Sequence, residues 1–381
     1  MSEKAIIAEG SLGGLTTGIV LEAAGFDVDI YERFPKVLDD RGAGIVMQAE
    51  TETFLTQYGG LKTDQTGVWL RYRQYLSHTG TADSYEEMPQ PMTSWGLIYR
   101  ALRSAFPNER YHEGRTLNGL SQNKNGVIVH FEEANPIKGD MLVGADGSGS
   151  FVRQQLMPEI KPRYAGYVAG RGVVPESSAS PTLIKTFVDC FTFQQMKRSH
   201  ILCYLIPGAD GEIEPGKRRL NWVWYWNVPE SALPELMTGV DGRERDFSVP
   251  PGQVRAEWFE KQNAIAERVL GPQFFELWRA TETPFLQPIL DLAVARMVQG
   301  RVILVGDAAF ISLARTRQQA QPRRARTPWL SNEPCKIIQT ILTLRSRNGN
   351  PISSRWGGIS NGRASRSVID RNFLKQNLSI L

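Results

Sequence analysis

The sequence predicts an α/β fold of two domains, one assembled from two separate stretches of chain and the other a strand-rich insert between them. Three observations carry this prediction: a strand–turn–helix–strand unit at residues 4–33, two later apolar strands that end in acidic turns, and an aromatic-rich block between those strands. The length of 381 residues exceeds one usual domain and allows two hydrophobic cores.

The first unit passes from strand to helix and back to strand. Ala5 to Ala8 form an apolar run, and the turn that follows contains Gly10, Gly13 and Gly14. Leu15, Ile19 and Ala23 then recur at helical spacing, Gly25 ends the helix, and Val28 and Ile30 belong to an alternating run typical of a strand. Glu32 closes the unit. Rossmann-like units of this kind bind dinucleotides, because N–H groups at the helix start attract a pyrophosphate and an acid about 20 residues later accepts a ribose hydroxyl.

The glycine turn departs from the usual GxGxxG pattern. If Gly14 is the third glycine, the first position is Glu9 and the second is Ser11. A carboxylate then stands where a glycine normally lies close to the phosphates. The turn predicts a dinucleotide site, and an ordinary βαβ opening without a ligand is the alternative.

A second motif follows the strand of DMLVGADGSGSFVRQQL. The strand ends at Val143, Asp146 and Gly147 make the turn, and Ser150 and Arg153 begin a helix. An Asp-Gly pair after a strand is commonly just a turn. The added Ser150 and Arg153 at fixed offsets make the motif more specific.

A third motif lies in RVILVGDAAF, residues 301–310. Four apolar residues predict a buried strand, Gly306 permits a bend, and Asp307 stands at the carboxyl end of the strand. Ligands of open α/β sheets bind at this end of the strands, so Asp307 is placed to accept from a ribityl or ribose hydroxyl. A helix-capping aspartate is the alternative.

Between the first and third motifs the patterns predict further elements. They are an apolar run at 45–47 after a loop, a helix starting near residue 50, strands within 68–92 and 126–131, and a helix over 93–107 that Pro107 ends. Residues 160–284 are rich in aromatics, and Trp222, Trp224 and Trp226 alternate as in a strand with one aromatic face. We expect this face to pack against another element rather than to line a pocket. The block is nevertheless where we expect substrate to bind.

Composition indicates a soluble cytoplasmic protein without a metal. No stretch approaches the roughly 18 apolar residues of a membrane span, and the N-terminal residues show no signal core. Three scattered cysteines suggest buried thiols at Cys190 and Cys203 rather than a disulfide framework, and the four histidines lack metal-ligand spacing.

Residues 311–381 carry 13 basic and two acidic residues, a net charge of +11, whereas the whole chain carries +4 and residues 1–310 therefore −7. The basic balance belongs to the tail, so nucleic acid is not an expected partner of the folded body.

With its three motifs in this order, the chain resembles the FAD-dependent aromatic-ring hydroxylases, the single-component flavoprotein monooxygenases. The stretches GGLTTGIVLEAAGFDVDIYER, TSWGLIYRALR, YAGYVAGRG and RLNWVWYWNV look most like the 2,6-dihydroxypyridine 3-hydroxylase branch. The resemblance covers residues 4–310. It implies a monooxygenase in which NAD(P)H reduces FAD, O₂ forms a flavin C4a-hydroperoxide, and an electron-rich phenolic or heteroaromatic ring is hydroxylated.

The resemblance also implies roles for single residues. It places Ser11, Leu12, Gly13 and Gly14 against the FAD pyrophosphate, and Glu32 and Arg33 at the adenosine. It places Asp146 and Gly147 near the flavin, where they assist use of the nicotinamide, and Gly306 and Asp307 at the ribityl chain. It names no catalytic base, for which His200, Tyr164, Tyr167 and Tyr204 are candidates that structural roles would explain as well. The implied fold is a Rossmann-like FAD-binding domain with an inserted substrate domain, and a homodimer is compatible with it.

Three features depart from the family. Glu9 replaces a turn glycine, and Gly170 stands where related sequences tend to place tryptophan ahead of Arg-Gly. After GDAAF, the family continues with a proline and a small-residue helix that faces the flavin, whereas this chain continues ISLARTRQQAQPRRARTPWL. One interpretation of the tail is a disordered basic arm that touches nucleic acid or anionic membrane; the hypothesis we favour is a shifted reading frame or mis-assigned exon, and translation of the other two frames tests it.

These observations give a definite prediction. Residues 1–160 and 285–310 form the FAD-binding domain, residues 161–284 form the substrate domain, and residues 311–381 form a divergent basic tail. The function is hydroxylation of an aromatic ring, and the alternative is an inactive member that keeps the fold but binds FAD poorly. Both require that Glu32, Asp146 and Asp307 converge in space.

Overall fold

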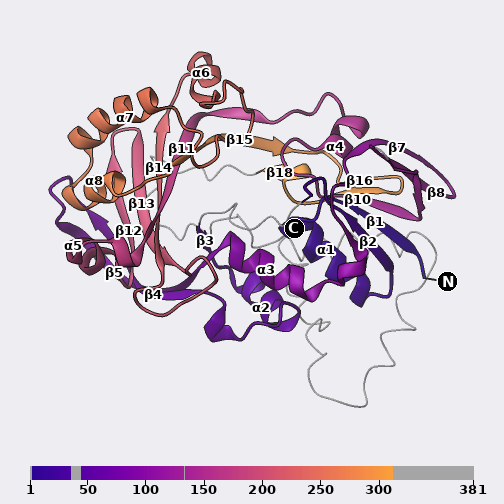
Figure 1. Ribbon diagram of the computed structural model, residues 1–381, viewed down its shortest axis with the longest axis horizontal. Coiled ribbons are helices and arrows are strands. Elements are labelled where there is room, and N and C mark those ends of the chain that lie inside the picture. Colours follow the sequence, from indigo (N-terminus) through magenta and orange to yellow (C-terminus); the bar gives the residue numbers. More distant parts are fainter. Residues whose placement is uncertain (1, 36–43, 133, 312–381) are drawn as a thin grey trace. The chain divides into compact units, whose positions relative to one another are not determined.

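The computed structural model describes residues 2–35, 44–132 and 134–311. The predicted loop around Arg41 and the predicted tail beyond residue 311 lie outside these ranges. Figure 1 shows the described elements in the order of the chain.

The first domain is built on a six-stranded sheet in the order β16-β17-β10-β1-β2-β6. Its strands are β1 (Lys4–Ala8), β2 (Asp27–Tyr31), β6 (Tyr111–His112), β10 (Met141–Gly144), β16 (Val298–Gln299) and β17 (Val302–Leu304). All neighbouring pairs are parallel except β16 with β17. The predicted α/β unit at residues 4–33 is confirmed, with α1 (Leu12–Ala23) between β1 and β2 and with Gly25 at φ 88° just beyond the helix.

Two layers cover this sheet. On one face, α1 packs on β2 so closely that a side chain at Gly18 would meet Ile30 at 2.9 Å, and α3 (Trp95–Ala105) lies beside α1. On the other face, a three-stranded sheet of β7 (Leu117–Asn123), β8 (Gly126–Phe131) and β9 (Ile137–Gly139) shares one buried core with β1, β10 and β17. The helix α4 (Phe151–Leu156) also contributes to this core.

The second sheet has nine strands in the order β18-β15-β11-β14-β13-β12-β4-β5-β3. The strands are β3 (Gly44–Val46), β4 (Val68–Leu76), β5 (Ala82–Ser94), β11 (Arg163–Pro175), β12 (Cys190–Met196), β13 (Ser199–Ile206), β14 (Arg219–Asn227), β15 (Phe285–Ala293) and β18 (Phe310–Ile311). The remaining helices are α2 (Ala49–Gln57), α5 (Pro181–Phe187), α6 (Leu233–Met237), α7 (Ala256–Val269) and α8 (Pro272–Arg279). Short 3-10 helices span Thr63–Gln65, Asn108–Arg110, Glu176–Ser178, Glu230–Ala232 and Gly306–Ala308.

The aromatic face of β14 packs against helices, as the alternation predicted. The ring of Trp222 lies 5.4 Å from that of Trp278 on α8, and Trp226 stacks on Trp258 of α7 at 5.6 Å. Figure 1 shows α7 and α8 running along this side of β13 and β14. Trp222, Trp224 and Trp226 therefore pack in a core with these helices.

Residues from both predicted domains contribute to the nine-stranded sheet. Besides strands from residues 163–227, it contains β3, β4 and β5 from residues 44–94 and β15 from residues 285–293. The domain boundaries at residues 160 and 285 stay predictions, and the two sheets interleave along the chain more often than those boundaries imply. Within the described ranges, no helix combines the length and the apolar composition that crossing a membrane requires.

Candidate functional site

The three sequence motifs meet at one edge of the six-stranded sheet. In the register of its parallel strands, Ala8 lies opposite both Tyr31 and Gly144, and Gly144 lies opposite Leu304. Backbone hydrogen bonds continue past the strand ends, where the Val305 N–H donates to the Gly144 carbonyl at 3.0 Å. The turns that follow these four strands are therefore neighbours, which is the convergence that the sequence prediction requires.

The first turn leaves room and hydrogen-bond donors in front of α1. A side chain at Gly14 would lie 1.9 Å from the Glu9 carbonyl oxygen, so only glycine permits this close packing, whereas a side chain at Gly13 would meet nothing within 4 Å. Ser11 at the N-cap makes no side-chain hydrogen bond to the helix, and the first turn, which begins at Leu12, contains no acid. The N–H groups of this turn remain for an anion.

Glu32 lies at the centre of the turn region. Its side chain is 1% exposed, and its two carboxylate oxygens accept hydrogen bonds from the Gly10 N–H at 2.9 Å and the Phe34 N–H at 3.0 Å. Arg33 points to Glu9 instead, with 3.1 Å between its Nε and Oε1 of Glu9. The carboxylate predicted to hold a ribose is thus fixed in position by the backbone of the turn itself.

Asp146 and Gly147 lie in the turn between β10 and α4, whose N-cap is Ser150. Asp146 is buried, and its carboxylate accepts from the Ser150 hydroxyl at 2.5 Å and from the Val152 N–H at 2.9 Å. Gly147 adopts φ 73°, the left-handed region that favours glycine. Burial raises the pKa of Asp146. The Asp-Gly motif therefore shapes the turn, and a direct contact of Asp146 with a cofactor stays a prediction.

The Gly-Asp motif presents an exposed carboxylate at the same edge. Gly306 has φ 60°, as the predicted bend requires. It is the first residue of a short 3-10 helix, Gly306–Ala308, whose N-cap is Val305. Asp307 lies inside that helix rather than at its N-cap, which argues against the capping alternative. Its side chain is exposed and receives a long hydrogen bond, 3.4 Å, from the Ser148 hydroxyl.

Two residues for which no cofactor contact was predicted hold these turns together. Arg153 is 1% exposed and donates to the Ala308 carbonyl at 3.0 Å and to the Ser148 carbonyl at 2.5 Å, so it links the second motif to the third. The Tyr111 hydroxyl donates to the Gly10 carbonyl at 3.0 Å, and its ring fills the space that a side chain at Gly10 would take. The offset of Arg153 within its motif signals its role, whereas no local pattern marks Tyr111.

The surroundings of the four candidate bases do not identify any of them as the catalytic base. Burial lowers the pKa of His200, which stacks on Tyr225, to about 4. Burial raises the pKa of Tyr164 to about 12, and its hydroxyl donates to the Val228 carbonyl at 3.0 Å. Burial also raises the pKa of Tyr204, and Tyr167 lies edge-on to Tyr225. No base is therefore assigned among the described residues.

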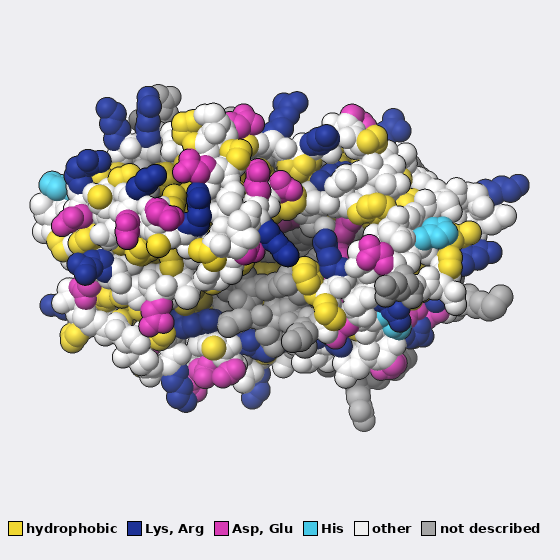
Figure 2. Space-filling view, turned by 45° about the horizontal axis from the view of Figure 1, so that its top comes forward, with side chains coloured by type: hydrophobic (Ala, Val, Ile, Leu, Met, Phe, Trp, Pro, Cys, Tyr) yellow, Lys and Arg dark blue, Asp and Glu magenta, His cyan; other side chains and the backbone are white. Residues whose placement is uncertain are grey.

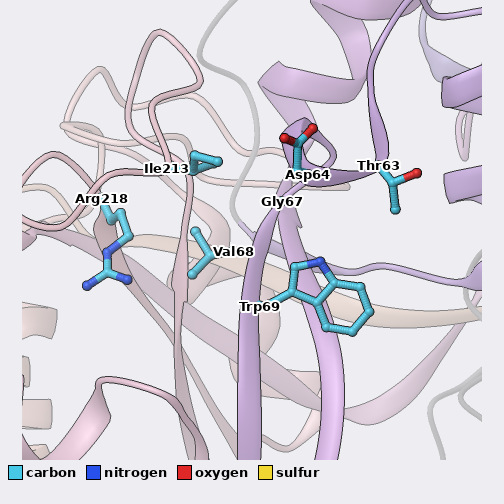
Figure 3. A pocket seen from close by; sticks show the side chains of 7 residues that line it. All are labelled: Thr63, Asp64, Gly67, Val68, Trp69, Ile213 and Arg218. Carbon is cyan, nitrogen blue, oxygen red and sulfur yellow. The ribbon is translucent and has the colours of Figure 1, made fainter.

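A surface hollow of about 380 Å³ lies away from these motifs. Figure 3 shows the residues that line it: Thr63, Asp64, Gly67, Val68, Trp69, Ile213 and Arg218. The guanidinium of Arg218 is already held by Glu176, with Nε–Oε2 2.9 Å and Nη2–Oε1 2.6 Å. No predicted site residue lines this hollow, so we assign it no role.

Comparisons with known proteins show what the chain is similar to. Residues 164–291 match a family model described as FAD binding domain-like. The chain is 36% identical over 311 residues to 2,6-dihydroxypyridine 3-monooxygenase of Paenarthrobacter nicotinovorans, which covers 81% of this chain and 77% of that protein.

Solved structures show the same fold. The structure of 2,6-dihydroxypyridine-3-hydroxylase from Arthrobacter nicotinovorans superposes with a TM-score of 0.77 and 35% identity, over 82% of this chain and 78% of that chain. Klebsiella pneumoniae HpxO, complexed with FAD and uric acid, superposes with a TM-score of 0.65 and 20% identity, over 90% of this chain and 79% of that one. At that identity the second likeness shows the fold alone.

Proposed function

Since the chain belongs to the FAD-dependent aromatic-ring hydroxylases, we propose that it holds FAD where its three motifs converge and binds an electron-rich ring against the nine-stranded sheet. The chain is an FAD-dependent monooxygenase that hydroxylates a small aromatic or heteroaromatic ring with O₂ and NAD(P)H. Bound FAD supplies the redox chemistry and the activation of oxygen. The protein's own residues bind and orient the two molecules and exclude water.

The convergence of three separate turns is the observation that carries the proposed cofactor site. The open first turn of α1 suits a pyrophosphate, the fixed carboxylate of Glu32 suits the ribose hydroxyls, and the exposed carboxylate of Asp307 suits the ribityl hydroxyls. Glu9 is the exception, because it adds a carboxylate where the phosphates approach.

A buried donor supports the proposed ring site. Neighbouring strands β11, β13 and β14 place Arg171, Tyr204 and Asn221 on the sheet face opposite the tryptophans. The Asn221 oxygen accepts from the Gly44 N–H at 2.9 Å and its side chain also interacts with Tyr204, but the buried Nε of Arg171 has no partner among the described residues. An unpaired buried donor is costly, and a hydroxyl or oxo oxygen of a ring would satisfy it. A dihydroxypyridine-like or phenolic substrate fits this requirement.

The direct test is spectroscopic and chemical. Purified protein should show the absorbance bands of bound flavin and consume NAD(P)H faster when 2,6-dihydroxypyridine or a dihydroxybenzene is added. Mass spectrometry should then find the ring one oxygen heavier, and a peroxide assay separates hydroxylation from simple NAD(P)H oxidation. A colourless protein that stays inert with added FAD would contradict the proposal and favour the inactive alternative.

Replacing Asp307 by alanine should weaken FAD binding about tenfold to a hundredfold, because a hydrogen bond to a charged acceptor contributes roughly 1.5–3 kcal/mol. Titration of apoprotein with FAD, followed by flavin fluorescence, gives the dissociation constant. Asp291→Ala is the matched control, since Asp291 is an exposed aspartate on β15 outside the site. Equal affinities of the two variants would remove Asp307 from the proposed site.

Compartment and assembly complete the proposal. Cys190 and Cys203 are buried free thiols, which agrees with a reducing cytoplasm. On the face in Figure 2, basic and acidic side chains of the described residues are interspersed, which gives no support to a nucleic-acid partner. Exposed Trp69 and Tyr85 on β4 and β5 are compatible with a homodimer, and light scattering would measure its mass.

A further inference from the structure

Glu9 occupies a backbone position that normally needs glycine. Its φ is 75°, and the turn cannot relax easily because the Glu9 N–H donates to the Tyr31 carbonyl at 2.8 Å while its own carbonyl oxygen lies against Gly14. A non-glycine residue in the left-handed region costs about 1–2 kcal/mol. The residue is therefore held in a strained conformation at the point where the phosphates of a dinucleotide would approach.

The surroundings of Glu9 contain more negative than positive charge. Its side chain is 12% exposed and lies between the carboxylate of Glu32 and the guanidinium of Arg33. Two other ionisable groups lie around the turn: the Tyr111 hydroxyl from β6 bonds the carbonyl of Gly10, and Asp146 from the loop after β10 interacts electrostatically with Arg33. Burial, with the charge of Glu32 as the next cause, raises the pKa of Glu9 to about 8, and Arg33 opposes this rise.

We propose that Glu9 couples dinucleotide binding at this turn to the uptake of one proton. The ionised side chain repels the pyrophosphate and engages Arg33, whereas the protonated side chain does neither and leaves Arg33 available to the nucleotide. This inference rests on the proposed function, because it assumes that the turn binds the pyrophosphate of FAD. It concerns a residue in which this chain departs from the GxGxxG pattern.

The direction of the effect follows from linkage. A bound pyrophosphate disfavours the ionised form of Glu9 and so raises its pKa further. Well below the pKa of free Glu9, the side chain is already protonated, and the affinity should change little with pH. Well above that pKa, each binding event must take up a proton, so the affinity should fall about tenfold per pH unit until the pH reaches the higher pKa of the complex.

The experiment compares FAD binding by wild-type apoprotein, Glu9→Gln and Glu22→Gln between pH 6 and pH 9. Glu9→Gln keeps the shape and the strained backbone but removes the proton, and Glu22 is an exposed acid at the far end of α1. Fluorescence titration gives the dissociation constants, and calorimetry at pH 8.7 in buffers of different ionisation enthalpy counts the protons taken up.

Wild type and Glu22→Gln should lose about tenfold in affinity per pH unit above pH 8 and take up close to one proton, whereas Glu9→Gln should bind without this slope. Equal pH profiles for wild type and Glu9→Gln would overturn the coupling while leaving FAD binding intact. Failure of every variant to bind FAD at every pH would overturn both the coupling and the proposed cofactor site.

Discussion

Replacing Arg153 by methionine should lower the free energy of unfolding by about 3 kcal/mol. The guanidinium is buried and bonds two carbonyls, those of Ser148 and Ala308, from loops that are 160 residues apart in the chain. Methionine retains much of the apolar volume but leaves both carbonyls without a donor, and each unpaired buried acceptor costs about 1–3 kcal/mol. Urea unfolding measures the loss.

The same substitution should weaken FAD binding, because Arg153 fixes the short helix that carries Asp307. Arg268→Met is the matched control, since it makes the same chemical change at an exposed position on α7. If Arg153→Met unfolds at the same urea concentration as this control, the two loops are held by other contacts and the bridging role is wrong.

Replacing Glu32 by alanine should weaken FAD binding about a hundredfold or more. The carboxylate is the proposed acceptor for two ribose hydroxyls, and hydrogen bonds to a charged group contribute roughly 1.5–3 kcal/mol each. The loss also leaves the N–H groups of Gly10 and Phe34 without their present acceptor, which loosens the turn. Fluorescence titration with FAD at pH 7 measures the change.

Asp29→Ala controls for the loss of a nearby buried acid. Asp29 lies in the middle of β2 and binds Lys4 and His112, so its removal should reduce stability without the same loss of affinity. The interaction of Glu32 with Glu9 gives a second readout. Without Glu32, the pKa of Glu9 should fall, because the negative charge of Glu32 contributes to raising it. A change in FAD affinity below threefold would exclude Glu32 from the ribose contact.

Local patterns were sufficient for the elements whose signals lie within a few residues. The spacing in residues 4–33 predicted β1, α1 and β2, and the Ser150 position predicted the start of α4, where the Ser150 hydroxyl accepts from the Arg153 N–H at 2.9 Å. These features depend on hydrogen bonds and periodicities inside one turn or one strand. The acidic ends of three parallel strands likewise predicted a shared edge, because parallel strands share one direction.

Contacts between distant segments could not be predicted in this way. Tyr111 bonds the Gly10 carbonyl across 101 residues, and nothing in the short segment around Tyr111 distinguishes it from a core tyrosine. The contact between the side chains of Glu9 and Arg33 was also missed, because sequence spacing does not show that the side chain at the turn folds back. The assembly of the nine-stranded sheet from four parts of the chain has no local signal either.

That assembly has a consequence for how the protein is made. The first sheet needs β17 from residues 302–304, and the second needs β18 from residues 310–311 to pair with β15. Neither sheet can therefore be completed on the ribosome until more than 300 residues have been synthesised. Because long-range strand pairing slows folding and leaves strand edges unprotected meanwhile, the nascent chain should depend on chaperones until the last of these strands emerges.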